Sequence, residues 1–220
     1  MSDARHDAPD GACTVHLEGV VGRYGGRKAV GPVSAALEGP GLYWIIGPNG
    51  SGKSTLLRTL AGLKRPAEGR VRWSAGGRAL GRGDLRARAG LAAPEIQLYE
   101  DLSARENLEF LARLRGVADA AGAAARGLEE AGLAARAHER PHAFSSGLRQ
   151  RLRLTAAWIA EPGLLLLDEP SSNLDEAGRA WLWQRVRERA RRALCVVATN
   201  HLDELAAAEP RLDLGGKRAS

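Results

Sequence analysis

A glycine-rich segment in the first quarter of the chain limits the possible folds more than any other stretch. It lies between the compact apolar run 42–46 and the segment 56–63, in which leucines recur at helical spacing. Its residues are Gly47, Pro48, Asn49, Gly50, Ser51, Gly52, Lys53 and Ser54. Two glycines separated by four residues and followed by Lys-Ser form the phosphate-binding loop pattern, which requires a strand before it and a helix after it. The sequence therefore predicts an α/β fold that binds the phosphates of a nucleotide.

The residue types of this loop suit a nucleoside triphosphate bound together with Mg²⁺. Glycines allow backbone N–H groups to face the phosphates, and the N-terminus of the following helix adds partial positive charge. Lys53 would neutralise the β- and γ-phosphates, and the Ser54 hydroxyl would ligate Mg²⁺. The alternative, a glycine-rich turn without a ligand, is disfavoured because the pattern is complete and occurs in the required context.

Polar side chains follow two further apolar runs, 164–167 and 194–199, which we expect to be buried strands. Asp168 is then placed for the metal, and Glu169 for the attacking water as general base or orienting group. His201 is a candidate contact to the γ-phosphate, although a lone histidine after a strand is more often a surface or capping residue. Because the carboxyl ends of parallel strands meet at one sheet edge, we expect these side chains to converge with the phosphate loop.

The order of elements predicts a P-loop NTPase core with a mostly parallel sheet. Alternating apolar residues and glycine turns from Thr14 predict an antiparallel β edge near the N-terminus. Ser103 and Glu106 have capping-box spacing, so a helix is expected to begin near residue 104. Ser146 precedes another amphipathic run and is expected to cap it.

The chain divides into three parts on the sequence alone. Residues 1–12 are polar and turn-rich, which predicts a disordered N-terminus. Residues 13–214 are expected to form a single domain, because 220 residues leave no room for two full modules. An α-helical subdomain is inserted at approximately 95–160, and residues 215–220 are a short C-terminal tail.

Charge and cysteine content restrict the partners and the compartment. The formal net charge is +6, but only four of the 32 basic residues are lysines, so the excess is mainly a bias toward arginine. We therefore expect no nucleic-acid partner. Cys13 and Cys195 fit neither a disulfide framework nor a metal-ligand spacing, which favours a reduced, cytoplasmic setting. The longest uninterrupted aliphatic run is 164–167, so the chain is not expected to span a bilayer unaided.

Five motifs in this order resemble the ATP-binding cassette of ABC transporters. Besides the loop at 47–55, they are residues 144–151, 164–170, 172–175 and His201. The resemblance extends from about residue 14 to residue 214. The segment 144–151 is similar to the signature motif of that family, which other P-loop groups do not carry at this place.

The resemblance implies a nucleotide site shared between two copies of the cassette. Tyr24 matches an aromatic residue that stacks on adenine, although a tyrosine buried in the core is the alternative. Asp175 matches a loop that crosses the dimer interface, and it can equally cap the helix that follows. The residues implied to contact the ATP of the opposite subunit, in a head-to-tail homodimer or heterodimer, are Ser145, Ser146 and Gly147. The residues implied to bind ATP in the same chain are Tyr24, Gly47, Pro48, Asn49, Gly50, Ser51, Gly52, Lys53, Ser54 and Thr55.

The chain departs from the family pattern at two places. Leu148 stands where the signature usually has Gln, and Phe144 replaces its usual Leu. Pro94 stands where the family has the Gln that contacts Mg²⁺ and the permease. Glu95 or Gln97 can replace it, since each offers an oxygen to the metal, and a missing contact is the third alternative. The implied metal ligands are Ser54 and Asp168, with Glu95 and Gln97 left open.

The resemblance implies an ATPase, with Glu169 and His201 as catalytic residues and with ATP and Mg²⁺ as cofactors. It would be a transporter subunit that drives translocation, by analogy export, through a separate transmembrane permease docked on the helical insertion. Its expected place is cytoplasmic, peripheral on the inner face of the plasma membrane. The alternatives are a haem-exporter-type ATPase of cytochrome c biogenesis, which Trp73 and the segment 98–108 weakly suggest, and a non-transport ABC ATPase acting on DNA or ribosomes. The second is disfavoured because the chain has one cassette and no sustained heptads.

Overall fold

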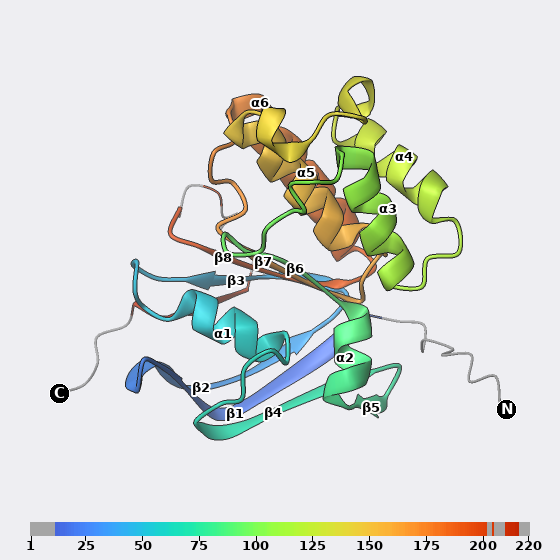
Figure 1. Ribbon diagram of the computed structural model, residues 1–220. Coiled ribbons are helices and arrows are strands. Elements are labelled where there is room, and N and C mark those ends of the chain that lie inside the picture. Colours follow the sequence, from blue (N-terminus) through green and yellow to red (C-terminus); the bar gives the residue numbers. More distant parts are fainter. Residues whose placement is uncertain (1–11, 202–203, 205–209, 216–220) are drawn as a thin grey trace, which may run out of the picture.

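Two β-sheets and a layer of helices make up the computed structural model, which describes residues 12–201, 204 and 210–215. Helix α1 (Lys53–Leu60) lies between the two sheets, and helices α3 to α6 lie beyond the other face of the parallel sheet (Figure 1). Most of the N-terminal segment 1–12 that is expected to be disordered, and most of the expected tail at 215–220, lie outside the described residues. Within them, every helix is too short or too polar to cross a membrane.

The parallel sheet has five strands in the order β6-β7-β8-β3-β9, so β3 lies between β8 and β9, two strands that come much later in the sequence. Leu167 of β7 pairs with Ala92, and Asp168 pairs with Ala198. Ile46 pairs with Thr199. The strands therefore end at a common edge, as the sequence predicts. Their bounds are β6 Ala89–Ala92, β7 Leu164–Asp168, β8 Leu194–Thr199, β3 Gly41–Ile46 and β9 Arg211–Asp213.

The antiparallel strands form a four-stranded sheet of their own, in the order β2-β1-β4-β5, beside the parallel one. Val15, Leu17 and Val20 of β1 are buried and belong to a core that also contains the leucines of α1. The sheet is separate because α1 has a second apolar side to cover, and an antiparallel sheet with one apolar face supplies that cover. Its strands are β1 Cys13–Tyr24, β2 Arg27–Glu38, β4 Glu68–Ala75 and β5 Arg78–Leu80.

Two helix starts test the capping predictions. Ser103 caps α3: its hydroxyl accepts from the Glu106 N–H, and the Glu106 carboxylate accepts from Ser103 in return. The expected cap at Ser146 is wrong by one residue. Ser145 has the extended backbone of a cap and accepts from the N–H of Leu148, so Ser146 is already helical. The remaining helices are α2 Arg82–Arg88, α3 Ala104–Leu114, α4 Ala120–Glu130, α5 Ser146–Trp158 and α6 Glu176–Ala190, with short 3₁₀ turns at Ala134–Arg136 and Pro141–Ala143.

The buried strand β7 separates two hydrophobic cores. Leu164 and Leu166 pack in the core shared with α1 and the antiparallel sheet. Leu165 and Leu167 pack in the core shared with α5 and α6. A third core holds α3, α4 and the outer side of α5 together, and Phe144 is buried in it. All the apolar residues of β7 are inaccessible to solvent, as expected for a strand covered on both faces.

Candidate functional site

The loop between β3 and α1 has the backbone that a phosphate-binding loop needs. Gly50 and Gly52 have φ values of 80° and 95°, in the left-handed region that favours glycine. A Cβ atom at Gly52 would lie 2.5 Å from the carbonyl oxygen of Ala29 on β2. Only glycine fits there, so the antiparallel sheet helps to fix the shape of this loop.

Lys53, the first residue of α1, lies across the loop and is only 6% exposed. Its ammonium donates to the carbonyl oxygens of Gly47 at 2.8 Å and Pro48 at 3.4 Å. It also lies 3.4 Å from a carboxylate oxygen of Glu169. A buried cation held by carbonyls and one carboxylate is placed to contact an anion bound inside the loop.

Asp168, at the end of β7, has the environment of a metal ligand. It is 4% exposed, and its Oδ1 atom has no hydrogen-bond partner within the described part of the chain. Burial raises the pKa of Asp168, and a hydrogen bond from the side chain of Ser54 opposes that shift. No group of three or more His, Cys, Asp and Glu among the described residues could hold a metal ion by itself. The Asp168–Ser54 pair therefore fits Mg²⁺, which is usually bound by one or two carboxylates together with substrate phosphates.

Glu169 follows with φ 46°, a strained conformation for a non-glycine residue. Its N–H donates to Ala198 O at 2.8 Å, which anchors this turn to β8. Its Oε2 atom accepts from the Thr199 hydroxyl and from the Asn200 N–H, both at 3.4 Å. The end of β8 thus positions the Glu169 carboxylate beside Lys53, so Glu169 lies next to the phosphate loop, as expected.

Residues after β8 contribute one contact that the sequence did not suggest. The Asn200 side chain donates to Asn49 Oδ1 at 3.2 Å and joins the strand end to the phosphate loop. Its only sequence signal is its place between β8 and His201. His201 is exposed, and its N–H donates to the Thr199 hydroxyl at 3.0 Å. Its assignment as a γ-phosphate contact stays a prediction.

Tyr24 lies at the end of β1 and is 67% exposed, so the alternative of a buried core tyrosine is wrong. The Lys64 ammonium lies 5.4 Å from the centroid of its ring. An exposed ring fixed at a hairpin presents a flat surface on which a base can stack. Stacking on adenine stays a prediction.

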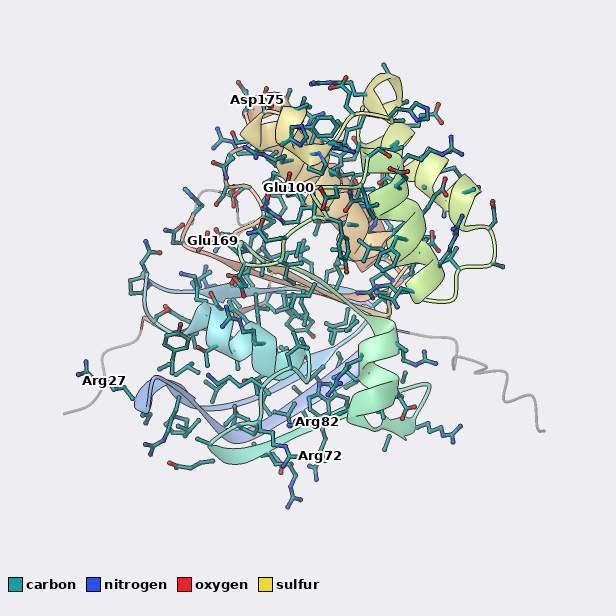
Figure 2. The ribbon with its side chains drawn as sticks, in the orientation of Figure 1. Arg27, Arg72, Arg82, Glu100, Glu169 and Asp175 are labelled. Carbon is teal, nitrogen blue, oxygen red and sulfur yellow. The ribbon has the colours of Figure 1, made fainter. Side chains whose placement is uncertain are left out.

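The structure does not bring the signature segment to the phosphate loop of the same chain. Ser145 and Ser146 are exposed at the start of α5, and a Cβ atom at Gly147 would lie 3.0 Å from Asn173 O. Asp175 caps α6 by accepting from the Gly178 N–H at 2.8 Å, which confirms the capping interpretation. Figure 2 shows Asp175 at the far end of the helical layer, well away from Glu169 at the sheet edge.

A residue that the sequence analysis did not single out connects the signature segment with the loop after β7. Gln150 on α5 is buried, and its side chain donates to Pro170 O at 2.8 Å, immediately after Glu169. This contact ties the signature helix to the loop that carries the catalytic candidate.

The two candidates for the missing glutamine lie in different surroundings. Glu95 pairs with Arg58 on α1, with Arg58 Nε donating to Glu95 Oε1 at 2.8 Å. Its negative charge is close enough to raise the pKa of Asp168. Gln97 lines a groove between the parallel sheet and the helical layer. Which of the two contacts the metal, if either does, stays a prediction.

That groove encloses about 360 Å³ and has a mainly apolar wall. Three arginines also line it: Arg86, Arg115 and Arg153. Burial lowers the pKa of Arg115 and of Arg153. Large apolar side chains are exposed within the groove or on α3 beside it, namely Leu63, Ile96, Tyr99, Phe110 and Leu114.

Comparison with known proteins gives matches along most of the chain. A family model described as ABC transporter matches residues 30–172. A daunorubicin resistance ATP-binding protein of Streptomyces coeruleorubidus is 37% identical over 175 residues, which is 79% of this chain and 55% of that protein. A linearmycin resistance ATP-binding protein of Bacillus subtilis is 32% identical, over 86% of this chain and 62% of that protein. A Nod factor export ATP-binding protein of Rhizobium leguminosarum is 32% identical, over 90% and 65%. The chain thus spans 55% to 65% of the length of these relatives.

Solved structures agree with the fold. An ATP-binding subunit of an ABC transporter superposes with a TM-score of 0.76 at 27% identity, over 86% of this chain and 80% of that chain. A dimeric bacterial ABC transporter cassette gives a TM-score of 0.79 at 24% identity, over 91% and 95%. These likenesses confirm the predicted P-loop α/β class with its parallel and antiparallel sheets.

Proposed function

This chain belongs to the ABC transporter family, and on that premise we propose that it is an ATP-hydrolysing subunit that drives transport through a separate membrane permease. The observation that carries the proposal is the meeting of Lys53, Asp168 and Glu169 at one sheet edge, beside the phosphate loop. These groups supply a cation for the phosphates, a buried oxygen for a metal and a carboxylate for the attacking water.

The chain's own residues would divide the reaction as follows. Lys53 and the loop N–H groups bind and orient the phosphates, and Tyr24 stacks on adenine. Ser54 and Asp168 would hold Mg²⁺, which when bound neutralises charge on the phosphate oxygens. Glu169 orients the attacking water and accepts its proton. His201, at the same edge, contacts the γ-phosphate.

The site is completed by a second cassette, as homodimer or heterodimer. Ser145 and Ser146 are exposed and Gly147 is half-buried at the N-terminus of a 13-residue helix, where N–H groups favour an anion. They lie away from their own phosphate loop, so they are available to the ATP of a partner. Asp175, whose side chain is 80% exposed, lies beside them and borders the same interface.

The apolar groove supports docking of the permease on the helical insertion. Exposed apolar side chains gathered around one groove mark a surface that another protein covers. We therefore propose that the chain acts at the inner face of the plasma membrane. We also propose that residues 13–214 act as one ATPase domain, with residues 95–160 as its helical subdomain.

Export is favoured by the relatives. The three named above are resistance or export ATP-binding proteins. These names favour a resistance or export system over the haem-exporter-type ATPase and over an ATPase that acts on DNA or ribosomes.

The test combines hydrolysis with partner capture. Mg²⁺-dependent ATP hydrolysis should be abolished by Glu169→Gln and unchanged by Glu129→Gln, an exposed carboxylate on α4. Tagged Glu169→Gln should also form a nucleotide-bound dimer by light scattering and recover a multi-span protein from detergent-solubilised membranes with Mg-ATP. Hydrolysis that is insensitive to Glu169→Gln contradicts the ATPase. Recovery only with ribosomes or DNA contradicts the transporter.

A further inference from the structure

The turn that carries Glu169 has a backbone conformation that needs support from outside the turn. Glu169 has φ 46° and precedes Pro170, whose ring disfavours all but extended conformations in the residue before it. Strained backbone of this kind persists only where the surrounding structure holds it. The Glu169 N–H donates to Ala198 O on β8 at 2.8 Å. This bond holds the N-terminal side of the turn, so the proline side needs a support of its own.

Gln150 on α5 supplies that support. Pro170 is buried, and its carbonyl oxygen accepts from the side-chain amide of Gln150 at 2.8 Å. Gln150 is itself only 5% exposed. A buried carbonyl left without a partner is costly, so the position of the Pro170 peptide group depends on that of the Gln150 amide. Strand β8 and helix α5 thus hold the Glu169 turn from its two sides.

Arg153 decides which way the Gln150 amide faces. The oxygen and the NH₂ group of a carboxamide are nearly equal in size, so their hydrogen-bond partners set the orientation. Arg153 lies one turn further along α5, and its Nη1 atom donates to Gln150 Oε1 at 2.6 Å. A guanidinium can only donate, so the amide oxygen must face Arg153 and the NH₂ group must face Pro170.

The groove wall limits the freedom of the Arg153 guanidinium. Arg153 lines the groove, and its Nε atom is buried there without a hydrogen-bond partner in the described part of the chain. Burial also lowers the pKa of Arg153. Packing therefore fixes one end of the guanidinium while the other end holds Gln150.

We propose that Gln150 and Arg153 are positioning residues for ATP hydrolysis, which together hold the strained turn that keeps Glu169 beside Lys53. The inference rests on the proposed ATPase function. The hydrogen bonds of the pair lead to Pro170 and to each other, and within the described residues none leads to the phosphate loop. The pair therefore acts on the rate of hydrolysis and not on the binding of ATP.

The experiment compares kcat for ATP hydrolysis with the affinity for a non-hydrolysable ATP analogue. Gln150→Met keeps the length of the side chain and removes both hydrogen bonds. It should lower kcat about tenfold and leave the affinity within about twofold, because the lost contact acts on Glu169 and not on ATP. Arg153→Met should lower kcat about threefold, because the Gln150 amide can then turn its oxygen toward Pro170. The double variant should match Gln150→Met, because Arg153 acts only through Gln150.

Conservative and matched variants serve as controls. Arg153→Lys keeps a donor on a side chain that can reach the amide, so kcat should stay within about twofold of the unmodified chain. Gln184→Met, at an exposed position on α6, and Arg126→Met, which removes an exposed ion pair with Asp119, should change neither kcat nor affinity. Thermal unfolding of each variant separates a loss of position from a loss of fold. Arg153 is partly exposed, so its variants keep the test informative if Gln150→Met does not fold.

Several results would overturn the inference. One is a kcat that responds to neither Gln150→Met nor Arg153→Met. Another is an equal fall in kcat and in analogue affinity, which would assign the pair to the general stability of the site. Additive losses in the double variant, or an Arg153→Lys variant as slow as Arg153→Met, would contradict the role of Arg153.

Failure of this inference is distinguishable from failure of the proposed function. Hydrolysis that does not respond to Glu169→Gln contradicts the ATPase itself. Hydrolysis that is lost in Glu169→Gln but unchanged in Gln150→Met and Arg153→Met overturns only the positioning role of the pair.

Discussion

The polar edge of the parallel sheet beside the phosphate loop, called here the nucleotide edge, and the arginine-lined groove are built in opposite ways. At the edge, polar side chains from β7, β8 and the phosphate loop contact one another, as Glu169 does with Lys53 and Asn200 with Asn49. In the groove, apolar side chains such as Tyr99 stay exposed after folding. The function of the edge is indicated by residue types at fixed spacing in the sequence. The function of the groove is indicated by apolar side chains that remain exposed after folding, which mark a surface for a partner. Variants in one region should therefore leave binding at the other unchanged.

Among variants at the nucleotide edge, the largest effect on ATP affinity is expected from Lys53→Ala. It removes a buried cation from the phosphate loop, so ATP affinity should fall at least about 100-fold, as expected for the loss of a charge-assisted contact. Equilibrium titration with a fluorescent ATP analogue measures this, with the exposed Lys28→Ala as control. Unchanged affinity would contradict the role given to Lys53.

A smaller effect at the same edge is expected from Tyr24→Ala. Loss of base stacking should lower ATP affinity about tenfold and leave the affinity for inorganic tripolyphosphate unchanged. Tyr24→Phe keeps the flat ring and should behave as the unmodified chain. Isothermal titration with both ligands checks the split, and an equal loss for ATP and tripolyphosphate would place Tyr24 elsewhere.

On the groove side, Leu114→Ser should lower recovery of the membrane partner about fivefold, because it removes part of an apolar contact area. Leu114 is 70% exposed, so thermal unfolding and ATP affinity should not change. Quantified capture from solubilised membranes is the measurement. A loss of ATP affinity in this variant would break the separation of the two regions.

The smallest effect concerns the signature segment. Ser145→Ala should lower the free energy of unfolding by about 1 kcal/mol, because it removes the cap of α5. Ser146→Ala should change it much less, since Ser146 does not cap the helix. Urea unfolding of both variants distinguishes the capping serine, and equal losses would refute the assignment.

Local patterns allowed the sequence to predict much of the fold. The start of α3 was predictable because Ser103 and Glu106 are three residues apart and cap each other. Ser145 and Ser146 could not be told apart, because either serine can cap and only the backbone conformation decides. The separate antiparallel sheet was not predictable, since it depends on the second face of α1, which contacts distant segments.

The same division holds for the site. The convergence of Lys53 and Glu169 followed from strand ends and a loop pattern, both of which the sequence displays. The Arg58–Glu95 pair joins residues 37 positions apart, and no periodicity marks it. The exposure of Tyr24 could not be predicted from the sequence either. Tyrosine is a residue type that is often buried, and only the hairpin geometry leaves this one at the surface.

The sequence of strand β7 bears on how its register in the parallel sheet is fixed. Four consecutive leucines precede Asp168, and cores on both faces accept leucine. A shift of the strand by one residue would exchange leucine for leucine at three positions, so apolar patterning hardly opposes it. The carboxylate does oppose it, because the shift would draw a charged group away from Ser54 or into an apolar core. Asp168, the proposed metal ligand, thus also helps to fix the register of β7. Replacing it with an apolar residue would remove the metal ligand and weaken the preference for the correct register.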